Sequence, residues 1–109
     1  MASVRLLVIY PRPKDVAVFE RQYTEQHLPL AAKKIPGKIK FVTAKVLGTP
    51  TGETPPFYRI AELHFPSLEA LQKAASSQGA QEAIADAVAL STGGAPIFVV
   101  AEEERPVPF

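Results

Sequence analysis

The residues best suited to acid–base chemistry in this chain are its two histidines and the tyrosines near them. His27 belongs to an apolar stripe at helical spacing, formed by Val16, Phe19, Tyr23, His27 and Leu30. Residues at steps of three and four share one helix face, so we expect His27 to point toward the core. An imidazole titrates near neutral pH and can act there as a general base or acid. The alternative is a core histidine whose ring is satisfied by a backbone carbonyl or a tyrosine hydroxyl.

Two tyrosines are placed where they can assist such a base. Tyr10 ends an apolar segment at residues 4–10, and Tyr23 precedes His27 by one helical turn. A phenol can orient an imidazole or donate a hydrogen bond to an oxyanion that develops on a substrate. Each tyrosine can equally be a core residue with one satisfied hydroxyl. We name Tyr10 and Tyr23 as catalytic candidates beside His27.

The second histidine, His64, lies on a segment that predicts a strand at residues 57–65. Alternate residues of a strand point to opposite sides, so Glu62 and His64 share one face and Arg59 lies on the other. If the first of these faces lines a pocket, it supplies the pocket with a carboxylate and an imidazole. If the other face lines it, the pocket receives an arginine instead. Glu62 and His64 can form an acid–base pair, which makes His64 the fourth catalytic candidate, while a solvated or inter-subunit ion pair is the alternative for Glu62 and Arg59. A metal site shared with His27 matches no conventional ligand spacing, so we predict no metal and no cofactor.

The apolar patterns predict four strands and two helical regions in the order βαββαβ. The strands are expected at residues 4–10, 38–47, 57–65 and 96–101. One helix is expected from Asp15 to about Lys34, with a kink or break near His27 because Pro29 disfavours helix continuation. The other is expected from Ser67 to about Leu90, interrupted at residues 76–79. This order predicts a single domain over residues 1–109 with an α+β, ferredoxin-like fold, in which both helices cover one face of a four-stranded antiparallel sheet.

The first and last strands are apolar on both faces, which predicts a second partner for the sheet. Leu6 and Val8 point to one side of the first strand, and Leu7 and Ile9 point to the other. A sheet with one solvated face normally alternates between apolar and polar residues, and two helices can cover only one face. We therefore expect a homodimer in which two sheets meet. The alternative is an exposed face with scattered apolar residues, which is common.

Composition excludes several classes of function. The 109 residues carry a formal net charge of +1 with no basic run, so nothing indicates a nucleic-acid partner. The chain has no cysteine, which removes disulfides and thiolate chemistry, and no apolar run approaches the ~18 residues of a membrane span. No phosphate-binding glycine loop and no serine nucleophile elbow is present. We expect a cytoplasmic protein.

Two groups of short motifs in the chain are similar to those of a known family. They are Tyr10-Pro11-Arg12, Phe19, Tyr23, His27-Leu28-Pro29-Leu30 and Ile35-Pro36-Gly37, then Ser77-Gln78-Gly79, Ala85-Asp86 and Gly93-Gly94. In their order and spacing the chain resembles the EthD family, named for a protein of ethyl tert-butyl ether degradation. The resemblance implies a dimeric α+β barrel, a pocket between sheet and helices, and a site at the histidine of the His-x-Pro motif. It also makes Asp86 an outside candidate, although we expect this carboxylate mainly to solvate a helix face.

The resemblance does not imply one reaction, because the wider superfamily includes cofactor-free monooxygenases, lactone isomerases, cyclases and haem-dependent enzymes. Our hypothesis is a protein that binds a small apolar or aromatic oxygenated metabolite and performs cofactor-free proton-transfer or oxygenase-type chemistry in catabolism, with His27 handling the proton. One alternative is a non-catalytic ligand-binding or accessory subunit. Another is a haem-binding barrel with His27 as axial ligand.

Overall fold

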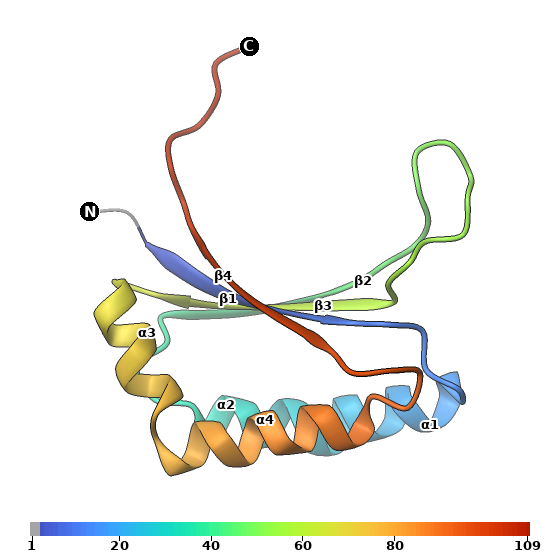
Figure 1. The fold of residues 1–109 in the computed structure, drawn as a ribbon, viewed down its shortest axis with the longest axis horizontal. Helices are drawn as coiled ribbons and strands as arrows, with labels where there is room; N and C mark the ends of the chain where they lie inside the picture. Colours follow the sequence, from blue (N-terminus) through green and yellow to red (C-terminus); the bar gives the residue numbers. More distant parts are fainter. Residues whose placement is uncertain (1–2) are drawn as a thin grey trace.

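A computed structural model describes residues 3–109 as a four-stranded antiparallel sheet with a layer of helices on one face (Figure 1). The elements in chain order are β1 (Val4–Tyr10), α1 (Val16–Gln22), the π-helical turn η1 (Tyr23–His27), α2 (Leu28–Lys34), β2 (Lys40–Lys45), β3 (Arg59–Phe65), α3 (Leu68–Ala75), α4 (Gln78–Leu90) and β4 (Ile97–Glu102). The strand order is β2-β3-β1-β4, as in a ferredoxin-like fold. The predicted fold class is confirmed.

Each helical segment that follows a loop begins at a side-chain cap. Asp15 accepts a hydrogen bond from the backbone N–H of Val18 at the start of α1. Ser67 and Ser77 do the same at the starts of α3 and α4. A cap of this kind stabilises a helix by about 1 kcal/mol. Because Ser77 has extended backbone geometry, it also separates α3 from α4, and the predicted interruption of the second helical region is confirmed.

Near His27, where the sequence predicted a kink or a break, the first helical region continues and widens by one residue. The backbone N–H of Leu28 donates to the carbonyl of Tyr23, which closes a π-helical turn. Pro29 has no N–H to donate, so the chain accommodates it by a wider turn rather than by an end. In a regular α-helix, steps of four drift around the axis, and the wider turn offsets this drift. The buried positions are therefore Phe19, Tyr23, His27 and Ala31, with Leu30 only half-buried.

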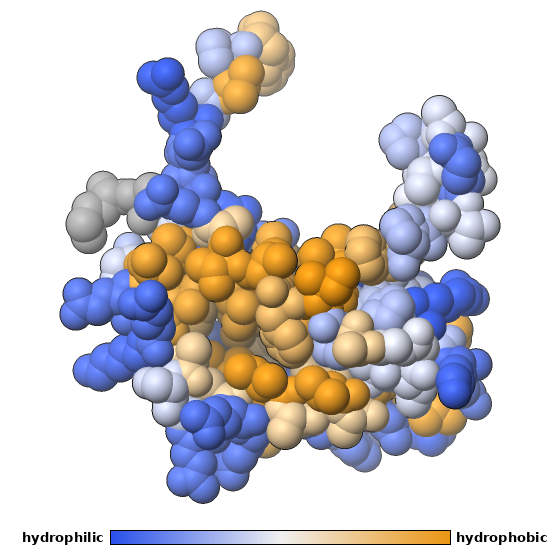
Figure 2. All heavy atoms as spheres, viewed as in Figure 1, coloured by the Kyte–Doolittle hydropathy of each residue, from blue (hydrophilic) through white to orange (hydrophobic). Residues whose placement is uncertain are grey.

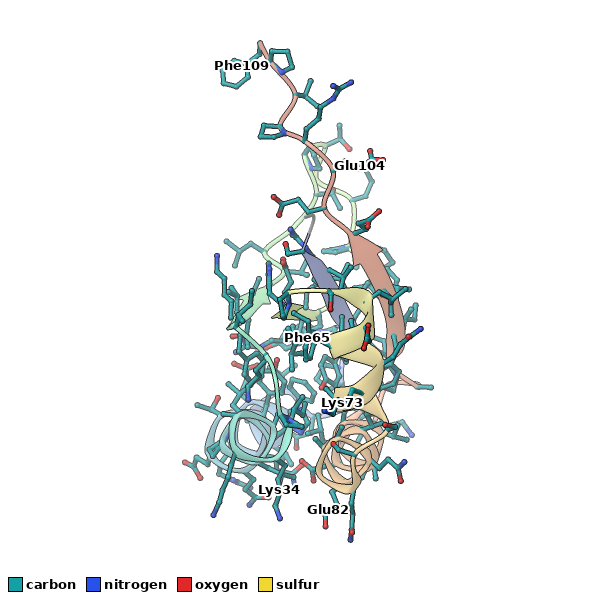
Figure 3. All side chains as sticks on the ribbon, turned by 90° about the vertical axis from the view of Figure 1, so that its left-hand side faces the viewer. Lys34, Phe65, Lys73, Glu82, Glu104 and Phe109 are labelled. Atoms are coloured by element: carbon teal, nitrogen blue, oxygen red, sulfur yellow. The ribbon has the colours of Figure 1, made fainter. Side chains whose placement is uncertain are left out.

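The strand register decides which side chains face the helices. Tyr10 pairs with Arg59 and Val8 pairs with Ala61, and paired residues point to the same side of the sheet. This side is the buried one, so the arginine face of the third strand lies against the helices. Glu62 and His64 lie on the opposite face. In Figure 3 the row formed by α1, η1 and α2 and the row formed by α4 lie side by side beneath the sheet.

No element among residues 3–109 covers the other face of the sheet. Its centre is apolar. Two segments project from this side of the molecule, namely the C-terminal segment after β4 and the loop between β2 and β3 (Figure 1). Figure 2 shows apolar side chains gathered along the sheet at the base of these two segments. The residues that point to this face from the centre of the four strands are Leu7, Ile9, Val42, Ile60, Ile97 and Val99.

Within residues 3–109, every helix is too short or too polar to cross a membrane.

Candidate functional site

A narrow apolar pocket lies between the sheet and the helix layer. Its walls include Val8 of β1, Leu63 of β3, Phe98 of β4 and Ala83 of α4, and its polar groups come from Tyr10 and His27. The cavity has a volume of about 20 Å³, which is enough for a single water molecule. The pocket therefore presents one phenol and one imidazole in apolar surroundings.

His27, the last residue of η1, is 6% exposed and has a partner at each ring nitrogen. Its Nδ1 lies 2.8 Å from Oδ2 of Asp86 in α4, and its Nε2 lies 3.4 Å from the hydroxyl of Tyr10. A carboxylate can only accept a hydrogen bond, so Nδ1 carries the proton in the neutral ring. Nε2 is then the accepting nitrogen, and the Tyr10 hydroxyl donates to it over a long contact. This arrangement leaves a basic nitrogen at the pocket wall.

Asp86 was expected mainly to solvate a helix face and was only an outside candidate for the site, but the structure pairs it with His27. The buried stripe of α4 contains Ala83 and Ala87, and Asp86 lies at the edge of that stripe with its side chain 38% exposed. A helix pattern identifies such a position as a boundary between core and solvent. The partner becomes visible only once α4 is paired with the helix that carries His27.

Tyr10 is fully buried and acts as a hydrogen-bond donor. Burial raises the pKa of its hydroxyl well above the usual range, and the nearby Tyr23 and Asp86 raise it further. A phenol in this state stays neutral in any ordinary buffer, so it cannot serve as the base itself. It can donate to His27 or to an oxygen of a bound ligand.

Tyr23 contacts His27 through its ring face rather than through its hydroxyl. The two rings are stacked with centroids 5.6 Å apart and an interplanar angle of 23°. The hydroxyl is buried and has no hydrogen-bond partner within residues 3–109. Burial raises the pKa of Tyr23 to about 12, partly opposed by the cation of Arg59 and reinforced by Glu20. The structure thus brings Tyr23 to His27 as a packing neighbour.

Arg59 lies against the ring of Tyr23 and forms an ion pair with Glu20 of the same chain. Its guanidinium lies 4.8 Å from the centroid of the Tyr23 ring, and its Nη2 lies 3.0 Å from Oε1 of Glu20. Burial acts to raise the pKa of the Glu20 carboxyl, but the hydrogen bond and charge of Arg59 outweigh it and lower that pKa. The predicted solvated or inter-subunit role of Arg59 is therefore corrected to an intramolecular ion pair.

His64 is not brought to the pocket, because it points to the open face of the sheet. Its Nε2 lies 3.2 Å from Oε1 of Glu62, and Arg5 binds the same oxygen at 3.2 Å. The pair of Glu62 with His64 thus exists, but on the face opposite His27. Among the residues that the structure describes, no three histidine, cysteine or acidic side chains are placed to hold a metal ion.

A family model, described as the EthD domain, matches residues 12–91 of this chain. This chain belongs to the EthD family. An uncharacterised 11.0 kDa protein of Rhodococcus erythropolis, from the thcB–thcC intergenic region, is 35% identical over 100 residues and covers 91% of this chain and 94% of its own. The crystal structure of an EthD-family protein from Bacillus halodurans is 30% identical, with a TM-score of 0.86, over 95% of this chain and 100% of the other.

More distant structures share the fold alone with this EthD-family protein. A dimeric ferredoxin-like protein of unknown function from Jannaschia is 18% identical with a TM-score of 0.69, over 93% of this chain and 99% of the other. The cofactor-independent oxygenase SnoaB from Streptomyces nogalater is 15% identical with a TM-score of 0.66, over 98% of each chain. Structural neighbours of this fold thus include an oxygenase that works without a cofactor.

Proposed function

We propose that this EthD-family protein binds a small apolar or aromatic oxygenated metabolite between sheet and helices, and that His27 moves a proton on it. The observation that carries the proposal is the placement of His27 between Asp86 and Tyr10 at the wall of an apolar pocket. Ligand sites usually combine apolar walls with a few directed polar groups. A cofactor-free oxygenase with the same fold supports chemistry of this class.

In this proposal each of the three polar groups has a separate role. Nε2 of His27 accepts a proton from a carbon or hydroxyl of the ligand that is acidified by a neighbouring oxygen function. Asp86 keeps Nδ1 protonated before the transfer and stabilises the imidazolium after it. Once Nε2 is protonated, the Tyr10 hydroxyl no longer has an acceptor there and can donate to the oxyanion that forms on the ligand. General base catalysis of this kind contributes roughly 10²–10⁴-fold in rate.

The pocket must open for a ligand to enter. Its volume of about 20 Å³ is far below the roughly 300–1,000 Å³ of typical ligand sites. The wall formed by α4 consists of Ala83, Ile84 and Ala87, and two of these three side chains are single methyl groups. We therefore include a ligand-induced separation of α4 from the sheet in the proposal.

The proposal also includes a homodimer formed through the open face of the sheet. Val42, Ile97 and Val99 point to that face and are 38%, 42% and 40% exposed in the single chain. A second copy related by a two-fold axis would bury the same residues on both sides. The Jannaschia protein of this fold is described as dimeric. We place His64, which lies on this face, at the dimer contact rather than at the site of proton transfer.

Haem ligation by His27 would need a much wider opening than a small metabolite does. Its Nε2 faces Tyr10, and the adjoining cavity has room for one water molecule. A non-catalytic ligand carrier remains the second candidate, because an apolar pocket can store a ligand without turning it over. The two differ in whether His27 is needed for a chemical change or only for binding.

The proposal is tested by native mass spectrometry of freshly purified protein, followed by assay of the ligand that is retained. We expect a dimer that carries a small organic mass, turnover of that compound by the unmodified protein, and loss of turnover in His27→Gln with binding kept. His64→Gln is the matched control and should keep turnover. Binding without turnover in every variant would favour the carrier, and equal turnover in His27→Gln would remove His27 as the base.

A further inference from the structure

The two ring nitrogens of His27 face two different environments. Nε2 adjoins the apolar pocket, whose cavity is about 20 Å³. Nδ1 binds Asp86, and this carboxylate also lines a second hollow of about 180 Å³, together with Gln22, Gln26, Ala89 and Leu90. The first space is apolar and the second carries two amides and a carboxylate.

The second hollow lies between η1 and α4 and is open to water. Gln22 and Gln26 reach it from the helical row that carries His27, and Asp86 reaches it from α4. The Asp86 side chain is 38% exposed, whereas that of His27 is 8% exposed. A space of this size holds several water molecules, and these waters can hydrogen-bond to the carboxylate and both amides. Asp86 therefore connects Nδ1 of His27 to bulk solvent.

We propose that a proton taken by Nε2 is shielded from exchange with water and returned to the ligand, so that the reaction is an internal proton shift in which the ligand regains the proton that it gave up. This inference rests on the proposed function and names its reaction class. Once a ligand fills the pocket, apolar side chains and the ligand surround Nε2, and water reaches only the opposite side of the ring. On the solvent-exposed side of the ring, Asp86 stabilises the imidazolium. The water on that side has no access to the transferred proton, which is on Nε2.

The step balances within the protein and its ligand. A C–H bond next to a carbonyl group breaks, its proton forms an Nε2–H bond, and its electron pair moves to the carbonyl oxygen as an enolate. Tyr10 donates to that oxygen. The Nε2–H bond then breaks as the proton returns to a different carbon of the same conjugated system, and His27 recovers its starting form. The product is an isomer of the ligand, and no oxidant, reductant or second substrate is needed.

The solvent access of the two nitrogens can be measured without knowing the ligand. The chain has two histidines, so ¹⁵N-histidine labelling of the His64→Gln variant leaves the signals of His27 alone. The ¹⁵N shifts of the neutral ring report which nitrogen carries the proton. In the protonated ring, hydrogen exchange of each N–H reports its access to water. We expect a proton on Nδ1 in the neutral ring, and in the protonated ring an exchange at Nε2 at least tenfold slower than at Nδ1.

Two variants separate the proposal from a general effect of burial. Gln26→Phe fills the hollow and should slow exchange at Nδ1 severalfold while leaving Nε2 unchanged; Glu25→Gln, beside it but outside the hollow, is the control. Exchange at Nε2 as fast as at Nδ1 would overturn the separate solvent access while leaving His27 available as the base. A neutral ring protonated at Nε2 would instead overturn the proposed function itself.

Discussion

The backbone of Gly79 packs directly against the carbonyl of Lys34, so closely that a Cβ at residue 79 would lie 2.2 Å from that oxygen. Gly79 lies in the first turn of α4 and Lys34 ends α2, and the two helices run antiparallel. Seven residues separate Lys34 from His27, and seven separate Gly79 from Asp86. Because seven residues make about two helical turns, the close approach at Gly79 fixes the distance at which Asp86 meets His27.

Gly79→Ala should destabilise the protein even though alanine favours helices. The added methyl collides with backbone rather than with a movable side chain, and overpacking of this kind costs about 1–3 kcal/mol. Because the collision with backbone at 2.2 Å is severe, we expect a cost near the upper end of that range. The free energy of unfolding, measured in urea, should then fall by roughly 2 kcal/mol after the gain of about 1 kcal/mol in helix propensity. The control is Gly48→Ala, where the Cβ meets no atom within 4 Å. An unchanged urea midpoint in Gly79→Ala would contradict the close packing of α4 on α2.

Tyr23→Phe should change how stability depends on pH at the alkaline end. Burial, opposed by Arg59 and reinforced by Glu20, raises the pKa of Tyr23 to about 12 in the folded chain, against 10.0 for an unperturbed phenol. The contribution of the neutral Tyr23 hydroxyl to the free energy of unfolding is fully present below pH 10. It is lost as the pH rises toward 12, and the loss is at most ~3 kcal/mol. We expect unfolding curves of Tyr23→Phe to show a smaller loss of stability over this window. Parallel curves for the two proteins would contradict the burial of the hydroxyl.

The same variant should be no less stable than the unmodified protein at neutral pH. The Tyr23 hydroxyl is buried without a partner within residues 3–109, and such a group costs about 1–3 kcal/mol in lost hydration. Removing it should therefore raise the free energy of unfolding or leave it unchanged. A clear drop in thermal midpoint would show that the hydroxyl has a partner, such as an internal water.

The fold could be predicted from the sequence because it depends on short-range patterns. Strand ends lay within two residues of those predicted, and Ser77 marked the break between α3 and α4. The turn before Pro29 was predicted as a kink or a break because proline forbids one hydrogen bond. Whether the chain ends or widens there depends on the tertiary packing of His27 and Ala31 in the core, which no local pattern contains.

Only part of the candidate site could be predicted from the sequence. Tyr10 and His27 were predicted because each ends or interrupts an apolar pattern, which marks a polar group inside the core. Asp86 lies 59 positions from His27, and its position on α4 is compatible with a solvated carboxylate. The failure for His64 has a different cause: alternation divides a strand into two faces but does not say which one meets the helices.

Asp86→Asn should unsettle the proton on His27 without unfolding the protein. An amide can turn either its oxygen or its NH₂ group toward Nδ1, so the preference for a proton on Nδ1 is lost. We expect ¹⁵N shifts of His27 to report a mixture of both neutral forms, and turnover of any identified ligand to fall by roughly 10²–10⁴-fold, as expected when a base loses its orienting carboxylate. Asp86→Glu is the matched variant that keeps the charge. An unchanged spectrum in Asp86→Asn would mean that Tyr10 alone fixes the proton.

Glu20→Gln should weaken the protein at neutral pH and cease to matter in acid. Burial acts to raise the pKa of Glu20, but Arg59 lowers it below 4.5, the model-compound value, in the folded chain. The ion pair therefore stabilises the fold above that value, and its contribution is lost as the pH falls through the folded-state pKa. Because Glu20 is partly exposed to solvent, we expect a difference of at most about 1 kcal/mol at pH 7, which shrinks as the pH falls through the folded-state pKa of Glu20. A difference that persists in acid would assign the effect to packing.

Val99→Asp should convert the proposed dimer into a monomer. Val99 points to the open sheet face from the middle of the edge strand β4 and pairs with Leu7 across the β1–β4 ladder. A two-fold contact through this face would bury two unpaired carboxylates, one from each copy. The matched control is Val88→Asp on α4, a residue 49% exposed against 40% for Val99. Light scattering coupled to size exclusion should give half the mass for Val99→Asp alone. Dimers in both variants would move the interface away from this face, and the uncovered apolar centre of the sheet would then need another partner.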